Sequence, residues 1–490
     1  MRIFKADTGR AVGRVGLSLM MMTCGCASLK DMSGCPRRDM TAAIDTVLQS
    51  DALRTAQTAV FVQRMDTGAV MYARSADTQL VPASNVKLIT GAGALLTWGP
   101  DRRFRTALAL AGGVSDGILN GDLVVCSEGD PSLRVEFTDN PLSCFEQWAA
   151  DLNRRGVREA RGDIVLLENP RGLAGYGAGW ALDDLPWGYA APVSRHQIHG
   201  NRVTVDMDPP EAGKETCSIR VFPPQAETWI DCQVTTAAEG PVTVSWRPGK
   251  AGLRVRGGLP PRSVPERLRL GAPEPVELYG MILKDTLATH GIAVTGRVVC
   301  QSAWHSQADL SFLTPWFSAP VSDLVTVMLR ESDNVLAESL VRLADGEGRF
   351  LSDPGRHMIK EKLTAAGVDL THVRYADGSG LSRYNHVSAR QLVSVLRVMG
   401  NSRHGDVWRR SLPLAGEEGT LSHRFIHTPL AGNLRAKTGS MSSIRALSGY
   451  FTGRSGEEYA FCILVNGASA PGRDVTAAVD KMVSLFYHAL

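Results

Sequence analysis

Three short segments of the sequence hold residue types that together could cleave an amide bond through a covalent intermediate. The first is Ser84-Asn85-Val86-Lys87, which pairs a hydroxyl with an amine. A serine hydroxyl is a weak nucleophile until a neighbouring base takes its proton. Residues three apart share a helix face, so the Lys87 amine can lie beside the Ser84 hydroxyl. Lys87 can serve as that base where desolvation or nearby positive charge lowers its pKa.

The second segment is Ser332-Asp333-Asn334, which lies between two stretches of helical periodicity. Its serine hydroxyl can relay the proton from Lys87 to a leaving amine. The side chain of Asn334 can both donate and accept, so it can hold a substrate amide and brace the lysine. Taken alone, such a tripeptide is more simply a helix cap, because Ser and Asn are favoured there.

The third segment is Lys437-Thr438-Gly439, which we expect at the end of a strand. A cation and a hydroxyl at that point can bind a free carboxylate, and Gly439 would let a substrate backbone approach closely. The backbone N–H groups of Ser84 and Ser440 are then the candidate oxyanion hole.

Each segment is weak evidence alone, but all three occur in the order that such an active site has, and each is expected in the local structure that its role requires. This set is typical of class A β-lactamases and penicillin-binding proteins. A metallopeptidase is disfavoured, because the eleven histidines form no HExxH motif or comparable cluster. We therefore expect no metal and no cofactor.

The elements that must position these residues form a discontinuous α/β domain. Residues 40–104 read as a hairpin and a helix, and residues 312–490 read as helices, strands and a closing helix. Between them, residues 105–311 read as short alternating strands between Gly/Pro-rich turns. We expect this β-rich insertion to form two subdomains.

Composition is that of a soluble multi-domain protein, with 490 residues of which 44% are hydrophobic and 21% charged. The net charge is only +3 and the sequence has no Lys/Arg run, so nucleic acid is not an expected partner. Basic residues precede the uncharged run 15–27, so residues 1–27 are expected to be an export signal and the protein to be secreted or periplasmic. Lipoprotein anchoring through Cys26 is the weaker alternative, because Thr23 and Cys24 fit a lipoprotein signal poorly. The oligomeric state is left open.

Nine cysteines are present, and export permits disulfides. We expect at least one disulfide in the mature protein, with Cys217–Cys232 as the first choice. Unpaired buried thiols are the alternative.

Several marker stretches extend the three motifs into a family resemblance. From about residue 45 to the C-terminus, the chain resembles the D-alanyl-D-alanine carboxypeptidase/endopeptidase family of low-molecular-weight class C penicillin-binding proteins, peptidase family S13. The long insertion between the Ser84 and Ser332 motifs also matches that family. The marker stretches are Gly121-Asp122-Leu123, Gly129-Asp130-Pro131-Ser132-Leu133, Arg161-Gly162-Asp163-Ile164, Trp180-Ala181-Leu182-Asp183-Asp184-Leu185, Asp377-Gly378-Ser379-Gly380-Leu381-Ser382-Arg383 and Gly416-Glu417-Glu418-Gly419-Thr420-Leu421.

The resemblance implies a multi-domain α/β protein with a β-lactamase/transpeptidase-like domain, in which helices flank a five-stranded antiparallel sheet and a large β-rich insertion interrupts the chain. It implies cleavage of peptidoglycan stem peptides and covalent inhibition by β-lactams. The roles carried over are Ser84 as nucleophile and Lys87 as base, with Asp184 and Arg383 contacting the side-chain end of the stem peptide. The remaining site residues are the catalytic Ser332, Asn334 and Lys437 and the substrate-binding Thr438, Gly439 and Ser440.

Two other functions share parts of this pattern. A serine β-lactamase would use the same three motifs, but class A chains have little between the first two. A catalytically inactive wall-binding homologue is disfavoured by the intact motif residues. The balance between carboxypeptidase and endopeptidase action stays open.

Overall fold

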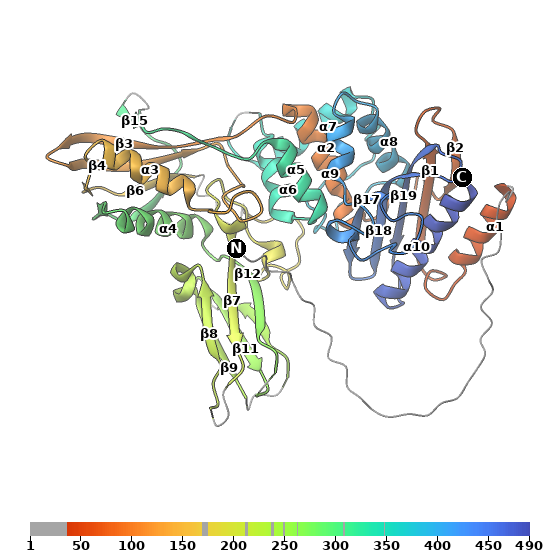
Figure 1. Ribbon diagram of the computed structural model, residues 1–490, viewed down its shortest axis with the longest axis horizontal. Helices are drawn as coiled ribbons and strands as arrows, with labels where there is room; N and C mark the ends of the chain where they lie inside the picture. Colours follow the sequence, from red (N-terminus) through yellow and green to blue (C-terminus); the bar gives the residue numbers. More distant parts are fainter. Residues whose placement is uncertain are drawn as a thin grey trace.

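The computed structural model describes residues 37–490 except 169–174, 211–213, 237–239, 248–249, 262, 307–308 and 347. The expected export signal and Cys26 lie outside the described residues. Figure 1 shows a layered sheet-and-helix part at one end, a second part around β3 and β4 at the other, and a β-rich part that projects between them.

The first layer is a five-stranded sheet built from both ends of the chain. Its strand order is β17-β18-β19-β1-β2, and every neighbouring pair is antiparallel. The strands are β1 (Gln57–Arg64), β2 (Val70–Arg74), β17 (Arg435–Met441), β18 (Ile444–Thr452) and β19 (Glu458–Asn466). Since β1 pairs with β19, the N-terminal hairpin and the C-terminal strands fold as one domain.

Helices cover both faces of this sheet, and successive residues of β1 alternate between the two cores. Val60 and Val62 pack in a cluster with α1 and α10, whereas Ala59 and Phe61 pack in a cluster with the other helices. The helices of this domain are α1 (Arg37–Leu48), α2 (Lys87–Trp98), α5 (Val321–Arg330), α6 (Asn334–Leu343), α7 (Ser352–Ala365), α8 (Ala389–Gly400), α9 (Gly405–Ser411) and α10 (Gly472–Ala489). The expected fold class is confirmed, with helices flanking an antiparallel sheet.

The insertion begins with the long hairpin of β3 and β4, which is the spine of an eight-stranded mixed sheet. Strands β15 and β16 pair with β3, so chain as late as Phe317 still belongs to this sheet. Two amphipathic helices, α3 (Ser143–Arg154) and α4 (Pro275–Thr289), cover its apolar face. The strands are β3 (Arg105–Ser115), β4 (Ile118–Ser127), β5 (Glu159–Ala160), β6 (Ile164–Leu167), β13 (Ala293–Val294), β14 (Val298–Gln301), β15 (Ser311–Phe312) and β16 (Trp316–Phe317).

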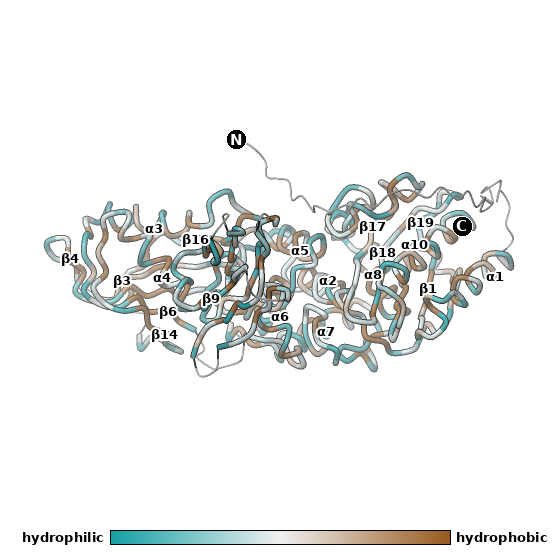
Figure 2. The backbone as a smooth tube through the Cα atoms, turned by 90° about the horizontal axis from the view of Figure 1, so that it is seen from below, coloured by the Kyte–Doolittle hydropathy of each residue, from teal (hydrophilic) through white to brown (hydrophobic). Residues whose placement is uncertain are grey.

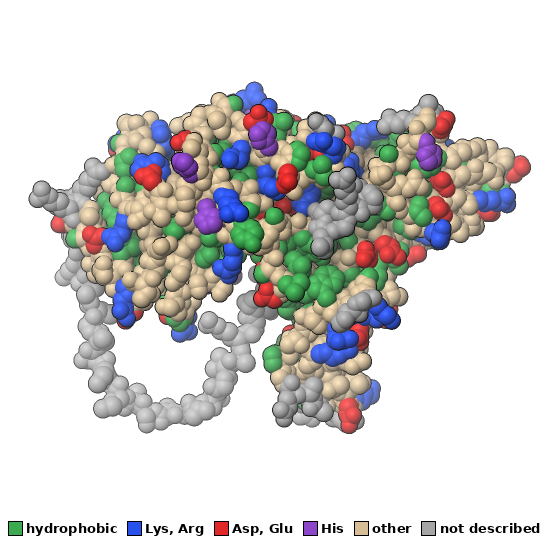
Figure 3. Space-filling model, turned by 180° about the vertical axis from the view of Figure 1, so that it is seen from behind, with side chains coloured by type: hydrophobic (Ala, Val, Ile, Leu, Met, Phe, Trp, Pro, Cys, Tyr) green, Lys and Arg blue, Asp and Glu red, His purple; other side chains and the backbone are tan. Residues whose placement is uncertain are grey.

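The projecting part consists of two three-stranded sheets around a small apolar core. The sheets have the orders β12-β7-β8 and β10-β11-β9. Figure 3 shows hydrophobic side chains gathered where this part leaves the rest of the molecule. The strands are β7 (Arg202–Asp208), β8 (Ser218–Phe222), β9 (Ile230–Thr235), β10 (Thr243–Trp246), β11 (Leu253–Gly258) and β12 (Glu266–Gly271).

The expected Cys217–Cys232 disulfide is absent from this structure, in which both residues carry free thiols. Both side chains belong to the core of the projecting part. However, the N–H of Cys217 bonds the carbonyl of Val234, which places Cys217 beside Val234 and offsets it along the strand from Cys232. The alternative of unpaired thiols therefore describes this state of the protein.

Hydrophobic segments concentrate inside the layers of the molecule and hydrophilic ones follow its outer turns (Figure 2). No helix among the described residues has the length and apolar character needed to cross a membrane.

Candidate active site

The first motif sits on a tight turn that leads into a buried helix. Ser84 belongs to a 3-10 turn (Ala83–Val86), and α2 begins at Lys87. The Nζ of Lys87 lies 3.0 Å from the Oγ of Ser84, which is hydrogen-bond distance. Lys87 is fully buried, because almost every turn of α2 packs inside the helical core. The Lys87 amine therefore lies beside the Ser84 hydroxyl while the whole lysine side chain is buried.

The second motif connects α5 to α6. Ser332 has a φ of 58°, which turns the chain sharply between the two helices. Asp333 is the N-cap of α6, since its side chain accepts from the N–H of Leu336. Asn334, the first residue of α6, accepts from Lys87 Nζ through Oδ1 at 2.6 Å. A helix cap and a catalytic contact thus coexist in one tripeptide.

The third motif lies within β17 rather than at its end. Lys437 Nζ donates to Ser332 Oγ at 2.9 Å, so the second and third motifs touch. The hydroxyl of Thr438 donates to that of Thr420 at 2.9 Å. Gly439 packs against the turn that carries Ser84, because a Cβ there would lie 2.8 Å from the carbonyl oxygen of Pro82. Its lack of a side chain therefore serves packing inside the protein.

β17 is an edge strand whose backbone faces the site. The N–H of Ala436 points outward, since it bonds the carbonyl of Pro413. Backbone direction alternates along a strand, so the N–H groups of Thr438 and Ser440 point the same way. No described segment pairs with this edge beyond Ala436. An extended substrate could bind along it, with the N–H of Ser440 available to an oxyanion.

Burial sets the protonation of the two lysines. Burial lowers the pKa of Lys87 to about 8, although Asp377, Asp333 and Glu338 partly oppose the change. Burial, and then the charge of Lys87, hold the pKa of Lys437 well below its usual value. A substantial fraction of Lys87 is therefore neutral near pH 8, as a general base requires.

The loop of the marker stretch 377–383, in which only Arg383 has an expected role, completes the site. The ammonium of Lys87 also donates to the carbonyl of Ser379, and Glu338 accepts from the N–H groups of Gly378 and Ser379 at 2.7 and 2.9 Å. Gly380 has a φ of 84°, and a Cβ there would lie 2.0 Å from the carbonyl oxygen of Ala83. Only glycine fits this turn. The marker stretch 377–383 was visible in the sequence, but its contacts with Lys87 were not.

The two more distant substrate-binding candidates lie on neighbouring loops. Asp184 accepts from the hydroxyl of Tyr189 at 2.7 Å, and Arg383 is exposed. Their loops meet, because Trp180 Nε1 donates to Asp377 at 2.7 Å and a Cβ on Gly179 would strike the ring of Tyr384. Asn334 also donates to the carbonyl of Tyr189 at 2.8 Å. The loop of the insertion that carries Asp184 therefore reaches the second motif.

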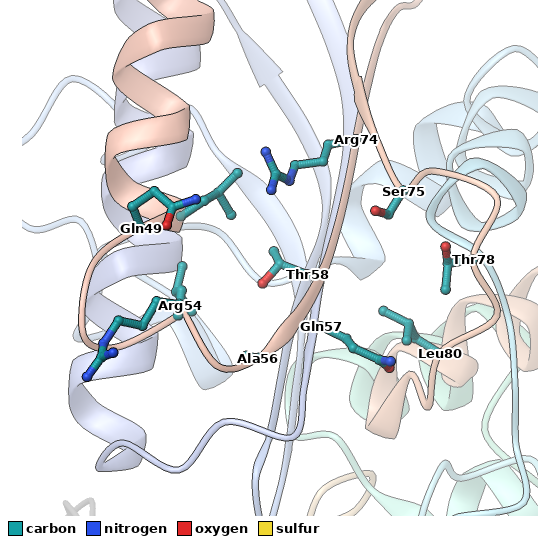
Figure 4. A pocket seen from close by; sticks show the side chains of 11 residues that line it. Gln49, Arg54, Ala56, Gln57, Thr58, Arg74, Ser75, Thr78 and Leu80 are labelled. Carbon is teal, nitrogen blue, oxygen red and sulfur yellow. The ribbon is translucent and has the colours of Figure 1, made fainter.

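A separate polar cavity of about 300 Å³ lies between the end of α1 and the start of β1 (Figure 4). Its lining includes Arg54, Arg74 and Thr58 but none of the three motifs. Within the described ranges, no cluster of three or more His, Cys, Asp or Glu residues could hold a metal ion.

Comparison with known proteins shows the family of the chain. The model of the D-Ala-D-Ala carboxypeptidase 3 (S13) family matches residues 40–486. A D-alanyl-D-alanine carboxypeptidase from Actinomadura sp. (strain R39) is 33% identical over 479 residues, which cover 94% of this chain and 88% of the relative.

Solved structures show the same architecture. The crystal structure of penicillin binding protein 4 (dacB) from Haemophilus influenzae has a TM-score of 0.80 at 26% identity and covers 90% of this chain and 98% of that one. The same H. influenzae protein complexed with a β-lactam has a TM-score of 0.75 at 24% identity, covering 91% and 99%. The chain belongs to the S13 family of D-Ala-D-Ala carboxypeptidases.

Proposed function

We propose that this S13 carboxypeptidase removes the terminal D-alanine of peptidoglycan stem peptides through an acyl-enzyme at Ser84. The observation that carries the proposal is the contact of Lys87 Nζ with both Ser84 Oγ, at 3.0 Å, and Asn334 Oδ1, at 2.6 Å. This contact joins a nucleophile, a buried base and an orienting amide, which is the arrangement that covalent catalysis requires.

Acylation begins when neutral Lys87 takes the proton of Ser84. The Ser84 oxygen then attacks the carbonyl carbon of the penultimate D-alanine, and the N–H groups of Ser84 and Ser440 receive the developing oxyanion. The C–N bond breaks as a proton passes through Ser332 to the leaving nitrogen, which releases free D-alanine. Water next attacks the ester carbonyl and gives a proton to Lys87. The bond between the acyl carbon and the Ser84 oxygen then breaks, Lys87 returns the proton to that oxygen, and the shortened peptide leaves with a free carboxylate.

The free carboxylate of the substrate fits the groups of the third motif. Thr438 offers a hydroxyl at the edge of the site, and Lys437 lies behind it in hydrogen-bond contact with Ser332. A carboxylate arriving there stabilises the protonated form of Lys437, because opposite charges favour ionisation. Substrate binding would thus charge Lys437 and connect it to the proton path through Ser332.

Two functional alternatives receive less support. An inactive wall-binding homologue does not require a fully buried lysine in contact with a serine hydroxyl. A β-lactamase needs a base that activates water, and Glu338 is already occupied: Oε1 accepts from two backbone N–H groups and Oε2 pairs with Arg342.

We also propose that the protein acts outside the cytoplasmic membrane, as a secreted or periplasmic enzyme. The basic and then uncharged N-terminus supports export, and a peptidoglycan substrate lies in that compartment. Cell fractionation with N-terminal sequencing tests this, and a cytoplasmic protein with an intact Met1 would contradict it.

The central experiment incubates purified protein with a D-Ala-D-Ala pentapeptide and with a cross-linked stem dimer. Release of D-alanine from the first measures carboxypeptidase action, and monomer formation from the second measures endopeptidase action. Mass mapping after benzylpenicillin treatment should place one adduct on Ser84. An adduct on Ser332, or none on a folded protein, would overturn the assignment.

A further inference from the structure

A buried cluster of charges connects the insertion to the second catalytic motif. Asp333 Oδ2 accepts from Arg134 Nη2 at 2.8 Å and from Arg202 Nη2 at 2.7 Å. Arg134 follows β4, and Arg202 opens β7, so the two arginines come from different parts of the insertion. Both ion pairs therefore join the insertion to the loop at the start of α6.

The cluster is shielded from water on most sides. The side chains of Arg134 and Asp333 are each 3% exposed, and that of Arg202 is 23% exposed. Arg134 also forms two hydrogen bonds with Glu136, at 2.8 and 2.6 Å. Two guanidinium groups thus face two carboxylates, which leaves the cluster without net charge.

Arg202 also holds the loop that reaches the substrate side of the site. Its Nε donates to the carbonyl of Gly188 at 2.9 Å, and the next carbonyl, of Tyr189, accepts from Asn334. Arg202 therefore contacts both Asp333, which precedes Asn334, and Gly188, which precedes the Tyr189 carbonyl that Asn334 bonds. Replacing Arg202 removes support from the backbone of Asn334 and from its hydrogen-bond partner.

We propose that Arg134 and Arg202 are positioning residues, which hold Asp333 so that Ser332 and Asn334 face the two catalytic lysines. This inference rests on the proposed function, because it assigns their role to acylation at Ser84. The insertion would then be part of the catalytic apparatus, although it supplies none of the three motifs.

Charge gives the proposal a second observable consequence. The groups that face Lys87 are Asp377, Asp333 and Glu338, which raise its pKa, and Lys437, which carries the opposing charge. Burial alone would raise the pKa of Asp333, but Arg134 and Arg202 outweigh it and keep the pKa far below its usual value. Asp333 is therefore ionised at any working pH, and the arginines balance its charge near Lys87.

The test measures benzylpenicillin acylation of Ser84 against pH in the full-length protein and in Arg202→Gln. Loss of the two hydrogen bonds of Arg202, to Asp333 and to the Gly188 carbonyl, should lower the acylation rate constant roughly 10- to 100-fold, as small misplacements of catalytic groups do. Without the positive charge of Arg202, the negative charge of Asp333 is less compensated and stabilises the ammonium of Lys87 more strongly, so the pKa of Lys87 rises. Acylation needs neutral Lys87, so the acid limb of the profile should move to higher pH.

Three further variants separate positioning from general damage. Asp333→Asn removes a negative charge, so its acid limb should move to lower pH. Arg202→Lys keeps the positive charge but loses the planar guanidinium that bonds two acceptors at once. Its acid limb should match that of the wild type, and its acylation rate should lie between those of Arg202→Gln and the wild type. Arg267→Gln breaks the exposed ion pair between β12 and Asp206 of β7, the strand that Arg202 begins, and should change neither the rate nor the acid limb.

Every outcome bears on the inference. The inference is overturned if Arg202→Gln acylates at the wild-type rate with the wild-type acid limb. It is also overturned if Arg202→Gln acylates more slowly with an unmoved acid limb and Arg202→Lys recovers none of the rate. The variants are made at Arg202 rather than at Arg134 because the side chain of Arg202 is partly exposed, whereas that of Arg134 is buried. If the wild type takes no penicillin at Ser84, the proposed function fails instead.

Discussion

Lys87 and Asn334 meet across the site at 2.6 Å, and both ends of the asparagine amide are engaged, because its Nδ2 donates to the carbonyl of Tyr189. This contact fixes which end of the amide faces the lysine. It also makes the lysine sensitive to the charge of that one side chain.

Asn334→Asp should therefore slow acylation and change its pH dependence. A carboxylate beside Lys87 stabilises the ammonium and raises its pKa above the value of about 8 in the parent protein. The wild-type rate should rise with pH through about 8, and that of the variant should rise only at higher pH. Stopped-flow acylation between neutral and alkaline pH measures both, and coincident acid limbs would contradict the assignment of Lys87 as base.

Ser84→Ala should abolish covalent labelling by penicillin and leave the fold intact. Ser84 is partly buried in a turn whose neighbours Ala83 and Val86 are buried in the core, so losing one hydroxyl costs little stability. Intact-protein mass spectrometry reads the label, and circular dichroism serves as the folding control. A variant that still labels would move the nucleophile elsewhere.

Lys87→Arg should lower the acylation rate roughly 10²- to 10⁴-fold, the usual contribution of a general base. A guanidinium stays protonated in proteins, so it cannot take the proton of Ser84. Lys437→Arg keeps a cation at the carboxylate end and should be the milder change. Equal losses of peptide cleavage in the two variants, each checked for folding, would refute the division of roles.

Gly380→Ala should displace the turn that carries Ser84. The new Cβ would lie 2.0 Å from the Ala83 oxygen and 2.9 Å from the Ser84 nitrogen, at a φ of 84°. Gly367→Ala is the matched control, because Gly367 has a φ of 96° but no heavy atom within 4 Å of a Cβ. Backbone strain alone costs on the order of 1–3 kcal/mol in either variant.

The difference between these two variants isolates the clash. Thermal unfolding gives their stabilities, and penicillin acylation gives their activities. We expect Gly367→Ala to acylate like the wild type and Gly380→Ala to lose most of its rate. Equal acylation in both would mean that the turn at Ser84 tolerates displacement.

Benzylpenicillin should acylate Ser84 quickly and leave slowly. The natural leaving group departs and opens the site to water, whereas the opened β-lactam ring stays tethered. Glu338 is buried and fully hydrogen-bonded, so it cannot activate water against that adduct. Trapping followed by dilution should show a long-lived adduct beside turnover of a D-Ala-D-Ala peptide. Rapid penicillin turnover without peptide cleavage would indicate a β-lactamase.

Sequence reasoning reached the parts of the site that are local in the chain. Ser84 and Lys87 are three residues apart, and a helix brings them together whatever the rest of the protein does. Individual elements could also be predicted: the hairpin expected within residues 40–104 is β1 and β2, and the closing helix is α10. Hydrophobic periodicity carries that information within a single element.

The remaining contacts depend on chain topology, which periodicity does not encode. Arg134 and Arg202 contact Asp333 across 199 and 131 residues, and Ser379 contacts Lys87 across 292. Arg134 and Ser379 lie in loops and Arg202 is the first residue of β7, and nothing local marks the two arginines, because solvated arginines are common on surfaces. The position of the third motif within β17, rather than at its end, was missed because strand ends are set by pairing with β18.

The pairing of β1 with β19 also constrains how the protein reaches its native state. Gln57 lies opposite Asn466, so the central sheet joins the first and last parts of the folded chain. During synthesis, β1 and β2 leave the ribosome long before β19, so the hairpin stays without its partner strand until the end of the chain is made. Such long-range pairing is slow and leaves strand edges exposed to aggregation. Chains that stop before β19 should thus be substrates for chaperones and proteases, even where the insertion has already folded.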